Sequence, residues 1–189
     1  MSCERTALSL LSRMSGIATQ TNFLVSKIRK INKKTKLYST RKTAPGLRFF
    51  DKEAIMIGGG HKHRMSLNDM VMIKDNHLLV TNSMEGIIKN ARKRHKHVEV
   101  EVENQRDAIL AASSGATIVM LDNFFPVQIK KTITALQKKK LRNKVKLEAS
   151  GGINSKNISA YAKTGVDMIS VGSITNSVKS LDLSLEVCV

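Results

Sequence analysis

The sequence predicts an α/β fold in which parallel strands close, or nearly close, into a barrel behind a long N-terminal helix. Short apolar runs alternate with helical stretches along the chain, the rhythm of strands that are joined by crossover helices. The chain has 189 residues, of which 41% are hydrophobic, and this is long enough for one well-buried domain but short for two. About seven strands are visible, fewer than the eight of a standard barrel.

The first expected element is a helix over residues 3–30. Its apolar residues recur near helical spacing, and they are Leu8, Leu11, Ile17, Leu24 and Ile28. We expect Gly16 to loosen this helix, because glycine is a weak helix former. The chain is therefore divided into an entry helix at residues 1–35 and an α/β barrel at residues 36–189.

The remaining elements alternate regularly. The expected strands are residues 36–39, 70–74, 98–102, 117–121, 144–149 and 168–171, with a possible last strand at 183–187. The expected helices are residues 52–57, 84–94, 105–114, 127–139, 155–163 and 175–180. In parallel barrels ligands bind at the carboxyl ends of the strands, so polar residues at these ends are the first candidates for a site.

Charged and glycine-rich positions follow the six strands one after another. They are Arg41 and Lys42, then Lys74, Glu101, Asp122, the sequence Ser150-Gly151-Gly152, and Gly172. Cations are concentrated at residues 40–48 and 61–64, around glycines 58–60. Because arginine grips a carboxylate or phosphate at two points, this cluster suits a small ligand with several negative charges. On this evidence alone, Arg41 and Arg64 could equally be surface residues.

Three glutamates, Glu99, Glu101 and Glu103, alternate with valines and share one face of the expected strand. One interpretation is a half-exposed strand with a solvated acidic side. The other is that Glu101, together with Asp122, binds a hydrated Mg²⁺, a hard cation that keeps waters and bridges substrate phosphates. Asp122 could instead cap a helix.

Two glycine turns follow the last strands of the barrel. Ser150-Gly151-Gly152 lies where a strand is expected to turn into a helix, so that free backbone amides can bind a phosphate, and Gly172-Ser173 repeats the pattern. Barrels of this type often bind phosphate at their last two turns. The alternative is that these glycines only serve backbone conformation.

The formal net charge of +17 raises nucleic-acid binding as an alternative function. Much of the charge lies in residues 27–36, 89–96 and 130–146, between the ligand motifs. Aromatic residues make up only 4% of the chain, so the interleaved rings that stack on bases are missing. Solvated helix ends and loops are therefore the preferred interpretation of the lysine runs.

The two cysteines, Cys3 and Cys188, lie at opposite ends of the sequence and have no metal-ligand spacing. They are typical of free thiols in a reducing compartment. No basic stretch followed by an apolar run begins the chain, and no segment approaches a membrane span. We expect a cytoplasmic protein without membrane association.

A series of motifs, in the same order, resembles quinolinate phosphoribosyltransferase, also called carboxylating nicotinate-nucleotide pyrophosphorylase. The motifs are Glu4-Arg5-Thr6-Ala7-Leu8, Thr40-Arg41-Lys42-Thr43, Pro45-Gly46-Leu47-Arg48, His63-Arg64-Met65, Ile73-Lys74-Asp75-Asn76-His77, Glu99-Val100-Glu101-Val102-Glu103-Asn104, Met120-Leu121-Asp122-Asn123, Ser150-Gly151-Gly152-Ile153, Thr164-Gly165-Val166-Asp167 and Val171-Gly172-Ser173. This resemblance implies an incomplete barrel of about six or seven parallel strands.

The resemblance also implies a reaction and the residues that perform it. Quinolinate and 5-phosphoribosyl 1-pyrophosphate would give nicotinate mononucleotide, pyrophosphate and carbon dioxide, a step of NAD biosynthesis, with Mg²⁺ as cofactor. The cations for the two quinolinate carboxylates would be Arg5, Arg41, His63, Arg64 and Lys74. The residues for 5-phosphoribosyl 1-pyrophosphate would be Lys42, Glu101, Asp122, Ser150, Gly151, Gly152, Gly172, Ser173 and Asn176. Lys42, Lys74, Glu101 and Asp122 would carry the catalysis. Asn176 stands where the family commonly has a histidine.

The family pattern further implies a homodimer or higher oligomer with shared active sites, in which the Arg5-like residue of one subunit closes the site of the other. The family usually has an N-terminal domain before the entry helix. Alternatives that remain open are a truncated or split-chain homologue that depends on a separate N-terminal-domain chain, and a related phosphoribosyltransferase that acts on a different ring acid.

Overall fold

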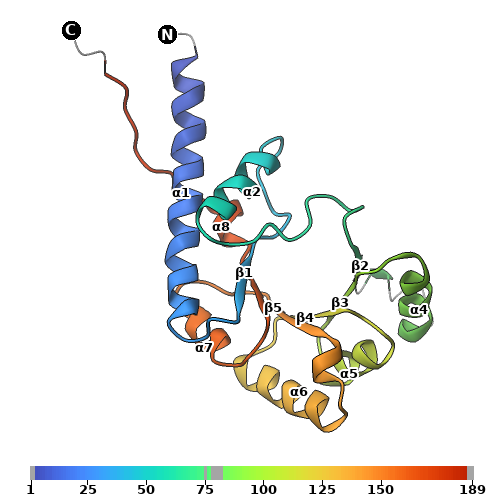
Figure 1. Ribbon diagram of the computed structural model, residues 1–189. Helices are drawn as coiled ribbons and strands as arrows, with labels where there is room; N and C mark the ends of the chain where they lie inside the picture. Colours follow the sequence, from blue (N-terminus) through green and yellow to red (C-terminus); the bar gives the residue numbers. More distant parts are fainter. Residues whose placement is uncertain (1–2, 75, 78–82, 187–189) are drawn as a thin grey trace.

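The computed structural model of the chain describes residues 3–74, 76–77 and 83–186. Its strands form one parallel sheet. The strand order is β1-β6-β5-β4-β3-β2: β2 to β6 pair in sequence order, and β1 pairs with β6 and not with β2 (Figure 1). The strands are β1 (Lys36–Tyr38), β2 (Val71–Ile73), β3 (Val98–Val102), β4 (Ile118–Asp122), β5 (Lys146–Ser150) and β6 (Met168–Ser170). This is the order of a barrel opened on one side, and the expected incomplete barrel is confirmed.

The helices match most of the expected ranges. They are α1 (Glu4–Arg29), α2 (Arg48–Ile57), α4 (Met84–Arg94), α5 (Gln105–Ser113), α6 (Pro126–Lys138), α7 (Ile158–Ala162) and α8 (Ser173–Asn176), and a 3₁₀ turn, η1, covers Arg142–Lys144. The helix expected at residues 175–180 was misplaced: α8 begins at Ser173 and the chain leaves the helix at Ser177. Among the described residues, no helix is both long and apolar enough to span a membrane.

The chain crosses from the β1 edge of the sheet to the β2 edge without forming another strand, so the barrel stays open on this side. After α2, His61 forms a single parallel bridge with Tyr38 of β1, and the backbone amide of His61 donates to the Leu37 carbonyl over 2.9 Å. Residues 62–70 then run from this edge to β2 as irregular backbone (Figure 1). The crossing segment carries His63 and Arg64 into the mouth of the barrel.

One face of the sheet is apolar and is buried in the hydrophobic core. In β3 the valines Val98, Val100 and Val102 are all buried in the hydrophobic core. Helix α5 packs against β3 and β4 and presents buried alanines, whose small side chains permit a close approach. The opposite face of the strands lines the barrel interior, so its polar residues are available for a site.

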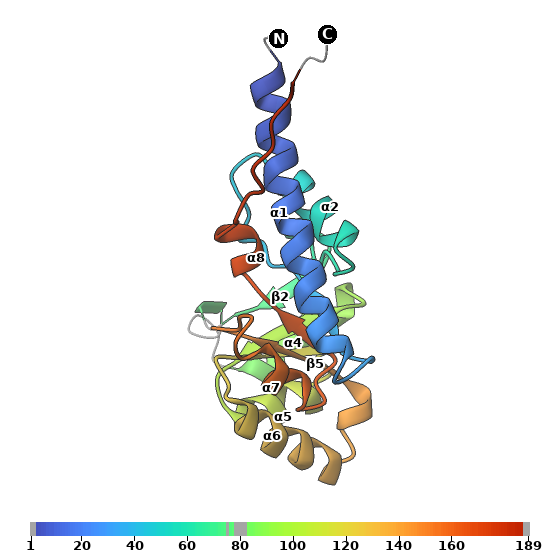
Figure 2. The ribbon, with the colours of Figure 1, turned by 90° about the vertical axis from the view of Figure 1, so that its left-hand side faces the viewer.

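Helix α1 packs along β1, α2, α7 and α8 through Ile17, Leu24 and Ile28. Its first turns project from the barrel, as the C-terminal segment does (Figure 2). The expected loosening at Gly16 was wrong, because the helix is continuous there. A side chain at Gly16 would place its Cβ 2.1 Å from the carbonyl oxygen of Lys179. The glycine therefore allows the C-terminal segment to pass against the helix.

The possible last strand at residues 183–187 is not formed over residues 183–186. The chain before it lies against α1, where the backbone amide of Leu181 donates to the Ser12 carbonyl over 3.1 Å, and the following residues run away from the helix (Figure 1). Cys3 is an exposed free thiol. Asp75, Val187 and Cys188 lie outside the described residues.

Candidate active site

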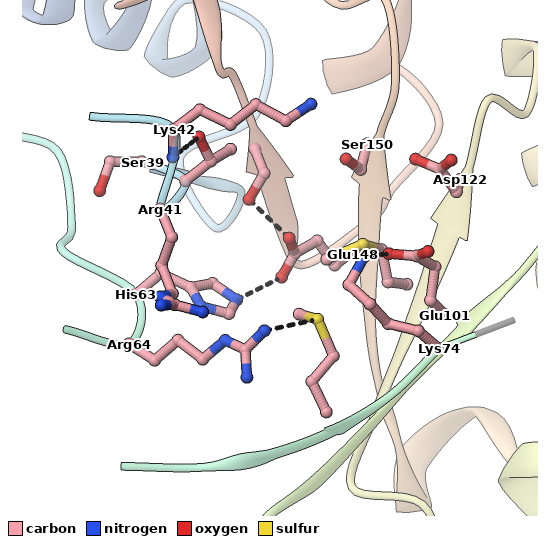
Figure 3. Close-up of a pocket in the computed structure, with 14 residues that line it drawn as sticks. Ser39, Arg41, Lys42, His63, Arg64, Lys74, Glu101, Asp122, Glu148 and Ser150 are labelled. Atoms are coloured by element: carbon pink, nitrogen blue, oxygen red, sulfur yellow. Dashed lines mark hydrogen bonds and ion pairs between the residues drawn. The ribbon is translucent and has the colours of Figure 1, made fainter. Parts of the chain in front are cut away.

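A cavity of about 290 Å³ opens at the carboxyl ends of the strands, and all six strands or their following residues contribute to it (Figure 3). Its lining comprises Ser39, Thr40, Arg41, Lys42, His63, Arg64, Met72, Lys74, Glu101, Met120, Asp122, Glu148, Ser150 and Ser170. Eight of the fourteen are residues that the sequence singled out, and they lie on opposite walls. Arg41, Lys42, His63 and Arg64 form a basic wall, and Glu101 and Asp122 lie across the cavity beside Lys74 (Figure 3).

The loop after β1 carries Arg41 and Lys42, and hydrogen bonds hold it at several points. The hydroxyl group of Ser39 donates to the Lys62 carbonyl over 2.9 Å, and that of Thr175 donates to the Lys42 carbonyl over 2.8 Å. The Nε atom of Arg41 is buried and has no hydrogen-bond partner within the part of the chain that the structure describes. A buried donor without a partner is costly, so this guanidinium is suited to an anionic ligand.

Arg13 and Asp51 fix the base of this loop. Two nitrogens of Arg13 donate to the two carboxylate oxygens of Asp51, each over 2.8 Å, and the Arg13 guanidinium also donates to the Thr175 carbonyl over 2.9 Å. Asp51 is fully buried and accepts from the backbone amide of Ala44 over 3.2 Å. The hydrogen bond and charge of Asp51 raise the pKa of Arg13. Helices α1, α2 and α8 are thus joined to the loop that carries Arg41.

Lys52 is fully buried beneath the crossing segment. Its ammonium group donates to the carbonyls of Lys62 and Arg64, the latter over 3.1 Å. Burial, followed by the nearby charges of Arg48 and Arg41, lowers the pKa of Lys52 to about 8. The two backbone contacts flank His63 on both sides and set the path of the chain into the cavity.

The acidic wall joins neighbouring strands. Lys74, after β2, donates to Glu101 of β3 over 2.6 Å, and Asp122 at the end of β4 accepts from the Asn123 side chain over 2.7 Å. Asp122 does not cap the next helix, because α6 begins at Pro126 and its N-cap is Phe125. Both carboxylates therefore remain at the cavity, where their oxygens are ligands that a hard divalent cation prefers.

A buried cluster of His63, Glu99 and Glu148 lies beside the cavity. The Nε2 atom of His63 is 3.1 Å from an oxygen of Glu148 and 3.5 Å from an oxygen of Glu99, and both glutamates are fully buried. A solvated acidic side of β3 is therefore excluded for Glu99, and only Glu103, after the strand, is exposed. Burial raises the pKa of Glu99, against the opposing hydrogen bond and charge of His63.

Sequence reasoning overlooked Glu148 and gave Glu99 no specific role. A signal was present, because Glu148 and Ser150 alternate along β5 as Glu99 and Glu101 do along β3. In the sheet Glu101 and Glu148 lie at the same level on either side of Met120 of β4, so acidic residues of two strands share this level of the barrel interior.

The glycine turns are arranged differently from each other. Gly151 and Gly152 have φ angles of 88° and 60°, and a Cβ at Gly151 would lie 2.6 Å from the backbone nitrogen of Asn123. Helix α7 begins at Ile158 and not at the expected residue 155, so its N-terminus is separated from the Ser150-Gly151-Gly152 turn by a loop. Gly172 is the N-cap of α8, and a Cβ there would lie 3.4 Å from Lys42 Cδ. This turn is thus beside the basic wall.

Several expected site residues do not line the cavity. Gly151, Gly152, Gly172, Ser173 and Asn176 belong to the adjoining turns, and the Asn176 amide nitrogen lies 3.7 Å from the Cβ position of Gly172. Arg5 is separate from the site: it is exposed near the start of α1, in the part of the helix that projects from the molecule (Figure 2).

Comparison with protein families matches residues 17–186 to "Quinolinate phosphoribosyl transferase, C-terminal domain". The chain belongs to this family. A "Probable nicotinate-nucleotide pyrophosphorylase [carboxylating]" of Methanothermobacter thermautotrophicus is 48% identical over 187 residues, which are 97% of this chain and 67% of the relative. The protein of the same name from Archaeoglobus fulgidus is 46% identical and is matched over 72% of its length. The chain therefore spans about two thirds of these curated relatives.

Solved structures of the quinolinate phosphoribosyl transferase family show the same fold. The nicotinate-nucleotide pyrophosphorylase from Francisella tularensis superimposes with a TM-score of 0.89 at 44% identity, over 97% of this chain and 64% of that one. NadC from Streptococcus pyogenes gives a TM-score of 0.88 at 41% identity, over 97% of this chain and 63% of that one. The long first helix and the opened barrel are therefore family features.

Proposed function

We propose that this chain provides the catalytic barrel for phosphoribosyl transfer to quinolinate with decarboxylation. The products are nicotinate mononucleotide, pyrophosphate and carbon dioxide. The observation that carries the proposal is one cavity with a basic wall and, across from it, an acid pair, in a chain whose relatives are named carboxylating nicotinate-nucleotide pyrophosphorylases. Such a cavity suits a small dianion next to a metal-bound pyrophosphate.

The basic wall is the proposed quinolinate site. Arg41 and Arg64 present guanidinium groups to the cavity, and His63 lies between them in the lining (Figure 3). Each arginine can hold one carboxylate at two points, which fixes both the position and the plane of the pyridine ring. A ring with a single carboxylate leaves one guanidinium without an anionic partner, so the wall favours a dicarboxylate.

The opposite wall is the proposed phosphoribosyl pyrophosphate site. The carboxylates of Glu101 and Asp122 lie at the ends of adjacent strands and offer hard oxygen ligands, and this donor set fits Mg²⁺. When bound, Mg²⁺ would neutralise charge on the leaving pyrophosphate. The proposed contacts to the phosphate groups are Lys42, from the adjoining end of the basic wall, and the backbone amides of the Gly151 and Gly172 turns beside the cavity.

The protein's contribution to the chemistry is positioning and preorganised charge. The bond between the ribose C1′ and pyrophosphate breaks as C1′ becomes cation-like, and the lone pair of the pyridine nitrogen forms the new bond. The ring then carries a positive charge next to its C2 carboxylate. The C2–carboxylate bond then breaks with release of carbon dioxide. The electron pair of this bond stays on C2 and binds a proton from solvent. Arg41, His63 and Arg64 hold the ring throughout.

The proposed active form is a homodimer in which Arg5 completes the site of the partner subunit. This is supported by the exposed position of Arg5 on the projecting part of α1, away from the cavity of its own chain. Mixing two inactive variants, Arg5→Ala and Arg41→Ala, tests it, because a mixed dimer contains one site with both native residues. Recovery of up to about a quarter of the wild-type activity is expected from statistical mixing, whereas no recovery excludes sharing.

The proposed reaction is tested by measuring nicotinate mononucleotide and carbon dioxide from quinolinate, 5-phosphoribosyl 1-pyrophosphate and Mg²⁺. Because the relatives are longer than the matched region, the assay is run on this chain alone and with the remaining region of the Methanothermobacter protein added. Equal amounts of the two products in either arm support the proposal. Absence of both products in both arms, or turnover of nicotinate in place of quinolinate, contradicts it.

A further inference from the structure

The imidazole ring of His63 is held more firmly than a lone ligand-binding histidine requires. Its Nε2 atom lies 3.1 Å from Glu148 Oε2, and the ring meets the Tyr38 ring edge-on, with 5.8 Å between the centroids. The His63 side chain is only 6% exposed although it lines the cavity. Figure 3 shows the ring directed from the crossing segment toward Glu148 on β5. The ring thus has one defined orientation.

Glu148 is itself fixed from the other side. The Ser170 hydroxyl group donates to Glu148 Oε1 over 2.5 Å, so the two carboxylate oxygens have different partners, Ser170 and His63. Glu99 on β3 adds a second fully buried carboxylate, one oxygen of which is 3.5 Å from the same Nε2 atom, and its other oxygen has no hydrogen-bond partner among the described residues. Carboxylates of two strands, β3 and β5, therefore meet at one ring nitrogen, and β6 fixes one of them through Ser170.

The backbone at His63 is adapted to this contact. His63 has a φ angle of 54°, in the left-handed region that a non-glycine residue seldom adopts. Lys52 binds the carbonyls of the residues before and after it, Lys62 and Arg64, and so maintains the strained turn. Strain that is kept by specific contacts at a site indicates that the resulting direction of the side chain is used.

We infer that Glu148, supported by Ser170 and Glu99, is a positioning residue that orients His63 and holds it as an imidazolium in the quinolinate wall of the cavity. The inference rests on the proposed function for the identity of the ligand. It goes further because it gives a role to the two buried acids, Glu99 and Glu148, to which the proposed function assigns none.

Charge balance explains why acids belong behind an anion site. Two buried carboxylates are unfavourable without a cation between them, and the imidazolium supplies it. The carboxylates of Glu148 and Glu99 favour the charged form of the ring. The cation of Arg64 in the same wall acts in the opposite direction, because like charges repel. Burial raises the pKa of Tyr38, so this ring neighbour is neutral. Burial lowers the pKa of His63, but the hydrogen bonds and charges of Glu148 and Glu99 outweigh burial and raise the pKa to about 9. His63 therefore presents a positive charge at neutral pH.

The first test needs no substrate. Protein labelled with ¹⁵N-histidine is titrated by NMR, and His63 is assigned among the five histidines by the signals lost in His63→Gln. In the wild type His63 is expected to stay protonated up to about pH 9. In Glu148→Gln its midpoint falls by one unit or more, whereas the exposed control Glu85→Gln leaves it unchanged. An unchanged midpoint in Glu148→Gln overturns the inference.

The second test separates positioning from a merely structural role. In Glu148→Gln the KM for quinolinate at pH 8 is expected to rise on the order of tenfold, as for loss of one charge-assisted hydrogen bond, while the KM for 5-phosphoribosyl 1-pyrophosphate stays near its wild-type value. Lowering the pH to 6 restores part of the quinolinate affinity by protonating His63. Equal rises of both KM values at both pH values overturn the inference, because they indicate general disorder.

A bound metal is the competing explanation for the cluster, since one nitrogen and the carboxylate oxygens lie within 4.8 Å of one another. Elemental analysis of the purified protein distinguishes the two. A stoichiometric transition metal that is lost in Glu148→Gln overturns the inference, because a metal-bound His63 is neutral. Failure of quinolinate binding with an intact His63 titration instead contradicts the proposed function and leaves the positioning of His63 in place.

Discussion

Lys74 Nζ lies 2.6 Å from Glu101 Oε2, and this contact joins the ends of β2 and β3 at the rim of the cavity. The Glu101 side chain is 16% exposed and that of Lys74 is 42% exposed, so the acid is fixed in the wall and the lysine reaches it from the edge strand. In the free protein the lysine neutralises the acid. Ligand binding can therefore break this ion pair, so that Glu101 contacts a cation and Lys74 contacts an anion.

The first prediction concerns the acid pair. Glu101→Gln and Asp122→Asn are each expected to raise the Mg²⁺ concentration required for turnover, or for binding of 5-phosphoribosyl 1-pyrophosphate, by tenfold or more. Hydrated Mg²⁺ depends on very few protein carboxylates, so loss of one is costly. Mg²⁺ titrations at fixed substrate concentration measure the effect. An unaltered Mg²⁺ requirement in both variants would remove these residues from the metal site.

The second prediction separates the cavity cations from the lysine runs. Arg41→Ala or Arg64→Ala should abolish measurable quinolinate binding, because one carboxylate loses its two-point contact. The matched control neutralises Lys138, Lys139 and Lys140 to glutamine, at exposed positions at the end of α6. Calorimetric titration of the three proteins decides, and equal losses in control and site variants would contradict the assignment.

The third prediction concerns stability. Arg13→Met is expected to lower the free energy of unfolding by about 3–5 kcal/mol, because it leaves the fully buried Asp51 carboxylate without its cation. Lys89→Met, which breaks an exposed pair with Glu85 on α4, should leave the free energy of unfolding almost unchanged. Urea denaturation measures both. A cost for Arg13→Met as small as that of the control would show that Asp51 has another source of compensation.

The fourth prediction is the pH dependence contributed by Lys52. Its pKa in the folded chain is about 8, below the ordinary value of 10.5. Between these values the unfolded chain binds more protons, so the contribution of Lys52 to stability must increase as the pH rises from 8 toward 10.5. The difference in unfolding free energy between wild type and Lys52→Met should therefore be larger at pH 9.5 than at pH 7.5. A difference that stays constant or shrinks contradicts the lowered pKa of Lys52.

Most of the fold could be predicted from the sequence because buried parallel strands are marked by local apolar patterns. Strand β3 was expected at residues 98–102 and is found there, and α4 was expected at residues 84–94 with equal accuracy. The ends of parallel strands meet at one edge by topology alone. The expectation that Arg41, Lys74, Glu101 and Asp122 lie together therefore follows from their positions at strand ends, and the cavity lining confirms it.

What the sequence did not reveal depends on contacts between distant residues. Gly16 is required by the passage of Lys179, and the partners of Glu148 come from Ser170 and the crossing segment. Residues 183–186 alternate between apolar and polar side chains as a strand does. A strand must also pair with a sheet edge, however, and local sequence does not encode whether the segment reaches one. Arg5 is separated from the cavity because a rigid helix carries it outward.

The most direct test of the account is binding of quinolinate compared with nicotinate, which lacks the second carboxylate. Both are titrated into the purified protein by calorimetry, in the presence and absence of Mg²⁺ and 5-phosphoribosyl 1-pyrophosphate, with Arg64→Ala as the control. We expect quinolinate to bind the wild-type protein at least tenfold more tightly than nicotinate, and Arg64→Ala to lose this preference together with measurable quinolinate binding, because the basic wall is built for two carboxylates. Equal affinities of the wild-type protein for the two acids would contradict the central claim.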